Sequence, residues 1–434
     1  MPSQSAATPL DVARLRVPVP VVDVDASLGA HRRLGPGWRA LQKWQLNCHF
    51  CNINGIVISR SLKPPSAGSF FLLGPRGTGK STWVEAVLPK ALTIDLLAES
   101  TYAELLGHAD RLEAMAAASG HRVVVIDEVQ KLPALLDEVH RLIEKRHLRF
   151  VLTGSSARKL KRSGANLLAG RARTLTMHPF TASELGDRFD LQHAIRFGML
   201  PTVWTAPDPG PYLKGYVGTY LREEVQHEAL VRNLAGFNRF LEAASFSQGS
   251  ILNVVSVAQD AGVNRKTVEN HFDLLEDLLL AVRLPVFSRR AKRKLTSHPK
   301  FYFFDAGVYR SLRPRGPLDS ADDIDGAAIE TLVLESLRAE NANHDLGYDL
   351  FFWRTGDGKE VDFVLYGERG LHAFEVKRSS RFREADLAAL RAFCDDYPEA
   401  RGCLLYGGQQ RYRFGRIDVV PLGEGLVGLA KRLG

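Results

Sequence analysis

The segment Gly74–Ser81, with the sequence GPRGTGKS, constrains the fold of this 434-residue chain more than any other feature. It matches G-x-x-x-x-G-K-[ST], follows the apolar run Phe70–Leu73 and opens a helical pattern at Ser81–Leu88. Glycines in such a loop let backbone N–H groups converge on phosphate oxygens beside a helix N-terminus. We therefore predict a strand, a phosphate-binding loop and a helix. The residues expected to bind the nucleotide are Gly74, Pro75, Arg76, Gly77, Thr78, Gly79, Lys80, Ser81 and Thr82.

An acidic pair supplies the second element of this site. The apolar run Val123–Ile126 ends in Asp127 and Glu128, and ligands of open α/β sheets bind at the carboxyl ends of the strands. We expect Lys80 to reach the β- and γ-phosphates, and Ser81 and Asp127 to hold Mg²⁺, Asp127 through water. Glu128 would orient and polarise the attacking water. The alternative is an acidic pair that only caps the next helix; the loop upstream favours ATP and Mg²⁺ as cofactors.

Polar and basic residues further along the chain are candidates for sensing the γ-phosphate. The run Arg149–Thr153 leads into Gly154, and then Ser155 or Ser156 is the candidate sensor, unless these serines cap a local turn. Arg171 is a candidate arginine finger that reaches the γ-phosphate of a neighbouring subunit, with Arg173 as its competitor. The plain alternative is a surface arginine.

The order of the elements predicts an α/β fold. Strands are expected at 70–73, 92–96, 123–126, 150–153 and 174–177 with helices between them, which implies a parallel sheet covered on both faces. Residues 207 to 300 are mostly helical in pattern. Strands return near 350–354, 361–366, 371–377 and 402–406. Residues 1–56 precede this order of strands and helices, and we expect them to form an accessory segment.

Composition excludes several classes of protein. The chain is 45% hydrophobic and 24% charged, as in globular proteins, and it contains neither an apolar run of membrane-spanning length nor an apolar signal core. A cytoplasmic protein without a membrane partner is therefore expected. Among its four cysteines, Cys48 and Cys51 with His49 form a candidate metal or redox site, or else are ordinary reduced cysteines. The net charge of +8 favours anionic partners such as DNA or RNA.

Two features of the middle region bear on nucleic-acid binding. In Ser256–Val268 a first helix would end at Gly262 and a second would be capped by Asn264, as in a helix-turn-helix. Arg265, Lys266 and Asn270 would face outward, and Val268 and Phe272 inward. The basic run at 288–294 would grip phosphates. The alternatives are a structural lid and a solvated charged loop.

The last third of the chain contains a possible carboxylate pair. Asp362 lies in one expected strand, and Glu375 and Lys377 share one face of the next because side chains alternate along a strand. Adjacent strands would place Asp362 beside Glu375. Such pairs bind Mg²⁺ and activate water for phosphodiester cleavage, with Lys377 positioning the water or offsetting negative charge. The alternative is a hairpin with ordinary polar residues.

These motifs together resemble a known group. The phrases DEVQ at 127–130, TGSS at 153–156, Gly170-Arg171 and PFTASEL at 179–185 resemble the prokaryotic AAA-type ATPases that carry a C-terminal restriction-endonuclease-like domain. The resemblance covers about residues 57 to 434. It implies an AAA-type core at 57–206, a helical lid with a winged-helix-like module at 207–312 and a nuclease-like domain at 313–434.

The carboxylates and lysine of the last third resemble those of the PD-(D/E)XK nucleases. That resemblance adds a glutamate from a preceding helix, matched here by Glu330, with Glu335 as a weaker alternative. Asp362, Glu375 and Glu330 would then be metal ligands. The function implied is ATP hydrolysis coupled to action on nucleic acid, including cleavage, in a homo-oligomer. The rivals are an ATP switch that binds DNA or protein without cutting, and a DNA-binding regulator in which ATP sets the oligomeric state.

Overall fold

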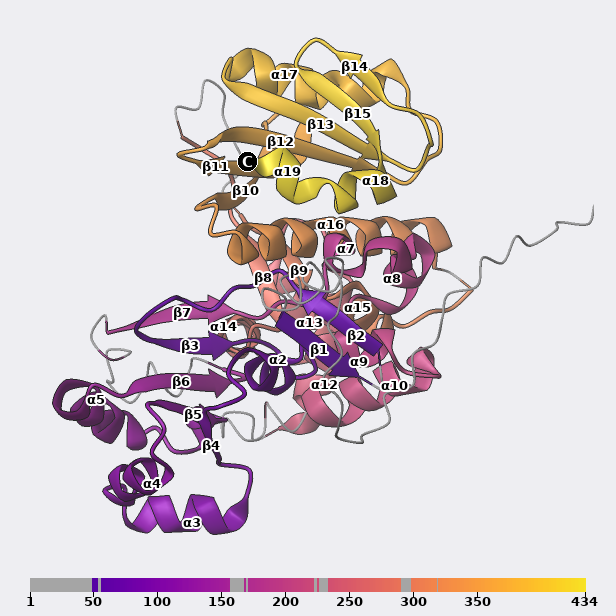
Figure 1. The fold of residues 1–434 in the computed structure, drawn as a ribbon. Helices are drawn as coiled ribbons and strands as arrows, with labels where there is room; N and C mark the ends of the chain where they lie inside the picture. The colour runs from indigo at the N-terminus through magenta and orange to yellow at the C-terminus, as the bar shows by residue number, and fades with distance from the viewer. Residues whose placement is uncertain are drawn as a thin grey trace, which may run out of the picture. The chain divides into compact units, whose positions relative to one another are not determined.

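The computed structural model describes residues 49–53, 56–156, 168, 171–221, 225, 233–289, 298–317 and 319–434 (Figure 1). The chain divides into two compact units, Met1–Asn47 and Cys48–Gly434, and all the described helices and strands belong to the second. Cys48 and the side chains of Cys51 and His49 lie outside the described residues, and so does the segment before them. The backbone of β1 (His49–Ile53) pairs antiparallel with β2 (Ile56–Arg60), so a hairpin begins upstream of residue 57.

The first large sheet has five parallel strands in the order β4-β5-β6-β3-β7. This confirms the predicted α/β fold with a parallel sheet. β-Branched and aromatic residues fill its central strands, which are buried on both faces. The strands are β3 (Ser69–Leu73), β4 (Leu92–Asp95), β5 (Val123–Asp127), β6 (Arg149–Gly154) and β7 (Ala172–Thr176). The helices that accompany them are α2 (Lys80–Val87), α3 (Glu99–Gly107), α4 (Arg111–Ser119), η1 (Val129–Lys131) and α5 (Leu135–Arg146).

A largely helical region follows the sheet. Near its end, three successive helices precede an antiparallel hairpin, β8 (Ala281–Leu284) with β9 (Lys300–Phe303), and one further helix follows the hairpin. Gly262 ends the second helix in a left-handed conformation, and Asn264 caps the third by accepting from the Thr267 N–H, as the sequence predicted. The helices are α7 (Ala182–Leu185), η3 (Gly186–Arg188), α8 (Leu191–Phe197), α9 (Pro201–Trp204), α10 (Pro209–Gly215), η4 (Tyr216–Tyr220), α12 (Leu234–Ser245), α13 (Val254–Ala261), α14 (Arg265–Asp277) and α15 (Ala306–Leu312).

The last region contains a mixed sheet of order β10-β11-β12-β13-β15-β14. The predicted strands at 350–354, 361–366, 371–377 and 402–406 are confirmed. The elements are α16 (Ala321–Asn343), β10 (Asp349–Arg354), β11 (Glu360–Gly367), β12 (Gly370–Lys377), η5 (Glu384–Leu387), α17 (Ala388–Asp396), β13 (Ala400–Tyr406), β14 (Tyr412–Phe414), β15 (Ile417–Pro421), α18 (Leu422–Val427) and α19 (Leu429–Leu433). In the described part of the chain, no helix is both long and apolar enough to cross a membrane.

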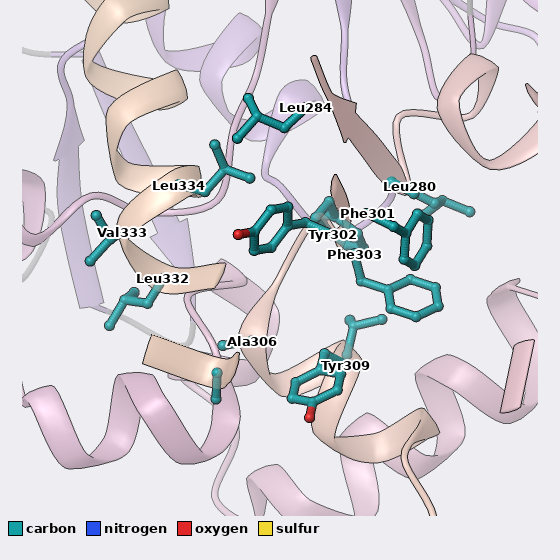
Figure 2. Close-up of a cluster of buried hydrophobic side chains, with 14 of the residues drawn as sticks. Leu280, Leu284, Phe301, Tyr302, Phe303, Ala306, Tyr309, Leu332, Val333 and Leu334 are labelled. Carbon is teal, nitrogen blue, oxygen red and sulfur yellow. The ribbon is translucent and has the colours of Figure 1, made fainter. Parts of the chain in front are cut away.

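One hydrophobic core joins the helical region to the last region. Figure 2 shows Phe301, Tyr302 and Phe303 of β9 packed among side chains of the β8 region, α15 and α16. The Tyr302 ring is fully buried, and its hydroxyl points toward α16. The expected domain boundary at 312/313 therefore runs through a continuous core, so side chains of the middle region lie within reach of the C-terminal carboxylates.

Candidate functional site: the phosphate-binding loop

The loop between β3 and α2 has the backbone that its glycines predict. Gly77 and Gly79 have φ values of 85° and 87°, which favour glycine. A Cβ on Gly74 would lie 2.4 Å from the Met177 carbonyl oxygen, so the loop passes too close to β7 for a side chain. The Gly74 N–H donates to the Gly154 carbonyl at 3.2 Å. The loop is thus held against both neighbouring strands at the carboxyl edge of the sheet.

The loop borders a cavity of about 510 Å³. Two of the expected nucleotide-binding residues, Pro75 and Thr78, are buried and shape the loop from within, because the Thr78 hydroxyl donates to the Pro75 carbonyl at 2.8 Å. The residues that line the cavity are Arg76, Gly77, Gly79, Lys80, Ser81, Thr82, Leu97, Tyr102, Asp127, Glu128, Gln130, Lys131 and Thr202. The structure therefore brings the predicted loop and the predicted acidic pair to one cavity.

Lys80 lies inside the loop that carries it. Its Nζ donates to the Gly74 carbonyl at 2.8 Å and to the Pro75 carbonyl at 3.2 Å, and the residue is 7% exposed. These carbonyls are neutral dipoles, so they orient the ammonium without cancelling its charge. The lysine is thereby positioned at the cavity as a cation that phosphate oxygens can approach.

The acidic pair is fixed by hydroxyl groups. The Ser81 hydroxyl donates to Asp127 Oδ2 at 2.9 Å, and the Thr153 hydroxyl donates to Asp127 Oδ1. A hydroxyl and a carboxylate at this spacing are the oxygen ligands that Mg²⁺ prefers, so the residues present fit the predicted ion. Glu128 has a φ of 57°, a left-handed conformation that is unusual for a non-glycine residue. Such strain often marks a functional side chain.

Thr153 is the residue that the sequence reasoning missed. It is fully buried, and its hydroxyl contacts Asp127 and accepts from the Glu128 N–H at 3.3 Å. Of the predicted sensors, the Ser155 hydroxyl accepts from the Gln130 side chain at 3.0 Å, and the same amide contacts the Glu128 carboxylate. Ser156 donates to the Asp277 carbonyl at 3.3 Å. A polar residue in an otherwise apolar strand was the signal for Thr153.

Arg171 lies at the opposite edge of the sheet. It precedes β7, whose Ala172 pairs with Ser69 at the start of β3, whereas the phosphate-binding loop follows the end of β3. Its guanidinium forms an ion pair with Glu144 and is 39% exposed. Arg171 thus does not belong to the cavity of its own chain, and its role toward a neighbouring subunit stays a prediction.

A buried arginine connects the loop to the following segment. The Arg60 guanidinium donates to the Thr78 carbonyl at 2.9 Å and to the His178 carbonyl at 2.6 Å, and it pairs with Glu184 Oε1 at 3.1 Å. Both side chains of the ion pair are fully buried. Further along, the Tyr216 hydroxyl donates to the Arg76 carbonyl at 2.9 Å. None of these contacts follows from a sequence motif.

Candidate functional site: the C-terminal carboxylates

The predicted carboxylates do meet on adjacent strands. The pairing of Phe363 with Phe374 places Asp362 next to Glu375 across β11 and β12, and both are buried. Asp362 Oδ2 accepts from the Val376 N–H at 2.9 Å, and Lys377 Nζ donates to Glu375 Oε1 at 2.7 Å. Burial and the nearby Asp362 raise the pKa of Glu375 to about 8. The strand pairing behind the nuclease-like prediction is therefore present.

The two candidate glutamates of α16, Glu330 and Glu335, have different neighbours. Glu330 of α16 accepts from the Tyr302 hydroxyl at 2.9 Å. Burial and the field of Asp362 raise the pKa of Glu330 to about 8, so it belongs electrostatically to the same cluster. Glu335, the weaker alternative, faces away from that cluster toward His178, whose Nδ1 lies 2.6 Å from its Oε1.

Lys300, which no motif indicated, supplies the cluster with an internal cation. It begins β9, is 2% exposed, contacts the Glu360 carboxylate and lies 3.6 Å from Asp362 Oδ1. Burial disfavours its charge, but Asp362, Glu330 and Glu360 outweigh that effect and raise its pKa. The ammonium therefore occupies a position between carboxylates where a metal ion was expected.

The oxygens of the cluster are largely committed to protein partners. Asp362 faces a backbone N–H and Lys300, and Glu375 Oε1 faces Lys377, which leaves the buried Glu375 Oε2 without a hydrogen bond. Within the described ranges, no group of three or more His, Cys, Asp or Glu side chains is arranged to hold a metal ion. In this arrangement the carboxylates do not fit Mg²⁺. The ligand set Glu330, Asp362 and Glu375 stays a prediction that requires Lys300 to move.

In the helix-turn-helix, the basic side chains lie close to an acidic side chain of the same helix. Arg265 and Lys266, expected to face DNA, are exposed but lie 2.9 and 3.6 Å from Glu269 of the same helix. Val268 and Phe272 are buried as predicted. The basic run at 288–294 falls mostly outside the described residues, and its Arg289 guanidinium lies 4.6 Å from the Tyr366 ring centre.

The parallel sheet, its loop and the acidic pair are those of a P-loop ATPase domain. Residues 67–186 match the AAA domain family, and residues 188–319 and 325–424 match two domains of unknown function, DUF8612 and DUF4143. The chain is 27% identical over 349 residues to the uncharacterised proteins Rv2008c of Mycobacterium tuberculosis and Mb2031c of Mycobacterium bovis, covering 79% of this chain and 77% of each relative.

A solved structure is also similar in part. The Walker-type ATPase PabY2304 of Pyrococcus abyssi aligns with 63% of this chain and 93% of its own length, at 15% identity and a TM-score of 0.39.

Proposed function

We propose that the chain hydrolyses ATP with Mg²⁺ at the cavity of the phosphate-binding loop. The observation that carries this proposal is the convergence of Lys80, Ser81, Asp127 and Glu128 on one cavity. Lys80 and the loop N–H groups bind the phosphates, and Ser81 with Asp127 holds the ion. When bound, Mg²⁺ neutralises charge on the β- and γ-phosphate oxygens.

In this proposal Glu128 orients the attacking water. The Gln130 amide contacts its carboxylate and so restrains it until the γ-phosphate is in place. The Thr153 hydroxyl contacts both the Asp127 carboxylate and the Glu128 backbone N–H. We therefore prefer Thr153 as the residue that senses whether Mg²⁺ is bound. Ser155 acts through Gln130, one contact further away.

Two substitutions separate the roles of lysine and glutamate. Lys80→Ala is expected to weaken nucleotide binding and abolish turnover, whereas Glu128→Gln is expected to bind ATP and hydrolyse it slowly. Equilibrium binding of a fluorescent ATP analogue and phosphate release would be measured for both. Glu85→Gln, an exposed glutamate on α2, is the matched control. Unchanged turnover in Glu128→Gln removes the assignment of the water-orienting residue.

We further propose that Arg171 completes the site of a neighbouring subunit. Its exposed position away from its own cavity supports a role in trans over one in cis. Arg171→Ala subunits mixed with Glu128→Gln subunits should regain part of the turnover, because each defect affects a different half of a shared site. A protein that stays monomeric with ATP excludes this role. Arg173→Ala tests the competing arginine.

Metal-dependent cleavage of DNA or RNA is the second candidate function. The adjacent Asp362, Glu375 and Lys377 support it, and the buried Lys300 opposes it. Labelled DNA and RNA would be incubated with the protein and Mg²⁺ or Mn²⁺, with and without ATP. Cleavage that EDTA and Asp362→Asn both abolish supports the nuclease. Salt-sensitive binding without cleavage under every condition favours a switch or a DNA-binding regulator.

A further inference from the structure

A second large cavity lies in the C-terminal domain. Its volume is about 810 Å³, within the range of roughly 300–1,000 Å³ that is usual for small-ligand sites. It is lined by residues of β12, β13, β15, α18 and α19, which Figure 1 places together in the C-terminal region. Phe374 lines it, and its neighbour Glu375 points to the opposite face of the strand. The cavity is thus separate from the carboxylate cluster and from the phosphate-binding loop.

Its lining is strongly basic. Three acidic and six basic residues line the cavity. The basic residues are Arg401, Arg411, Arg413, Arg416, Lys431 and Arg432. Asp418 pairs with Arg432 at 2.7 Å and lies 3.8 Å from Arg413, and Glu424 pairs with Arg411. Asp418 and Glu424 are therefore used by three of the arginines. With Glu399, the third acid, counted as well, the six cations still leave a net positive charge at the cavity.

Two of the cations are free to bind a ligand. The side chains of Arg401 and Lys431 form no hydrogen bond or ion pair with any residue in the described part of the chain. Arg416, by contrast, donates to the Cys394 carbonyl at 2.8 Å and to the Pro398 carbonyl, which fixes its guanidinium in place. The cavity thus combines one arginine oriented by neutral carbonyls with two unpaired cations, an arrangement suited to an anion.

One histidine also lines the cavity. The apolar residues beside it, Phe374, Cys403 and Val420, are buried in the core and expose at most 3% of their surface. The Tyr348 hydroxyl donates to the Leu433 carbonyl at 2.8 Å, so the His372 Nε2, 3.1 Å away, must donate to the Tyr348 oxygen. Burial, with Arg401 and Arg432, lowers the pKa of His372 to about 4, so near neutral pH its Nδ1 is a bare acceptor.

We propose that this cavity binds a small phosphate-bearing ligand, with its phosphate against Arg401 and Lys431. The net positive charge and the two unpaired cations select an anion, and the volume is that of a small-ligand site. The His372 acceptor can receive a hydrogen bond from a hydroxyl or amino group of the ligand. The site is additional to the ATP site and does not depend on it.

The test uses the full chain with its first site filled. The protein is saturated with Mg²⁺ and a non-hydrolysable ATP analogue, and AMP, GMP, CMP, UMP and inorganic pyrophosphate are titrated in turn by calorimetry. We expect one further binding event for at least one of these phosphate-bearing ligands. Arg401→Glu and Lys431→Glu should each weaken it about tenfold or more, since a charge-assisted hydrogen bond is worth about that factor.

Controls make every outcome decisive. Arg401 and Lys431 are exposed, so their substitution does not disturb the core, and Arg381→Glu is a matched charge reversal on an exposed arginine outside the cavity. No further binding by any of these ligands at millimolar concentration overturns the proposal. Binding that both cavity variants leave unchanged also overturns it. Binding of a single-stranded oligonucleotide alone replaces the small ligand with nucleic acid and overturns it as well.

Discussion

The molecule contains two polar centres built from the same residue types, and they differ in how their charges are balanced. At the phosphate-binding loop, Lys80 is oriented by neutral carbonyls and Asp127 by two hydroxyls, beside a cavity of about 510 Å³. In the C-terminal cluster, Lys300 lies against carboxylates and Asp362 faces that lysine. In these contacts the first centre orients its charges with neutral groups, whereas the second pairs its charges with one another.

This difference separates a site that awaits a ligand from one that contributes to folding. Opposite charges that meet inside a protein must offset their own desolvation, and removing one partner leaves the other buried alone. The carbonyls that orient Lys80 are neutral, so they do not become unpaired buried charges when Lys80 is replaced. Substitutions in the first centre should therefore change chemistry, and those in the second should change stability.

The largest effect is expected for the lysine of the loop. Lys80→Ala should lower ATP turnover by at least about a hundredfold, because a preorganised charge at the transferring phosphate is lost. Lys300→Met should leave turnover within about twofold of wild type once folding has been verified. Steady-state phosphate release at saturating Mg²⁺ and ATP distinguishes the two. Equal losses in both variants contradict the separation of the centres.

The next effect concerns the free energy of unfolding. Lys300→Met should lower it by about 3–5 kcal/mol, since the Glu360 and Asp362 carboxylates then lack their cation. Asp362→Asn added to Lys300→Met should restore part of the loss. Denaturant unfolding followed by tryptophan fluorescence measures both. Wild-type stability in Lys300→Met would mean that the ammonium is dispensable, and a metal ion could then take its place.

The C-terminal cluster should also make stability depend on pH. The pKa of Glu375 is raised from 4.5 to about 8 in the folded chain, so folding favours the protonated form. Its contribution is fully present below pH 4.5 and is lost as the pH rises through 8. Glu375→Gln stays neutral and should flatten the decline in stability over this window. Thermal unfolding from about pH 5 to about pH 9 measures it, and a curve parallel to wild type is the contrary result.

The smallest effect is expected at Thr153. Thr153→Val keeps the shape of the side chain but removes the hydroxyl that contacts Asp127 and the Glu128 backbone. Turnover should fall about tenfold while ATP affinity changes little, because only the arrangement of the two acids is disturbed. Ser155→Ala, a residue one contact further from Glu128, should have a smaller effect. The reverse order would identify Ser155 as the sensor.

The sequence predicted those parts of the sites that local pattern determines. The loop, Asp127 and Glu128 follow from a contiguous motif and an apolar strand, and the pairing of Asp362 with Glu375 follows from alternation along neighbouring strands. Lys300 could not be predicted in the same way, because it lies about sixty positions before its partners and no motif marks it.

Thr153 shows a different kind of limit. Its segment was identified, but which of the three polar residues Thr153, Ser155 and Ser156 turns toward the acids depends on where β6 ends. The tilt of a strand end is set by its contacts with neighbouring elements, and a sequence pattern does not contain that information. The role of Arg171 could not be predicted from the sequence either, because it depends on a contact with a neighbouring subunit.

The buried Arg60 has a consequence for how the protein can be divided. The match to the AAA domain family spans residues 67–186, yet Arg60 precedes it and supplies the buried partner of Glu184 and of the Thr78 carbonyl within it. A fragment cut at the limits of the match would retain a buried carboxylate without its cation. A fragment that keeps this packing must therefore include Arg60, so the limits of the family match are not the limits of the folded unit.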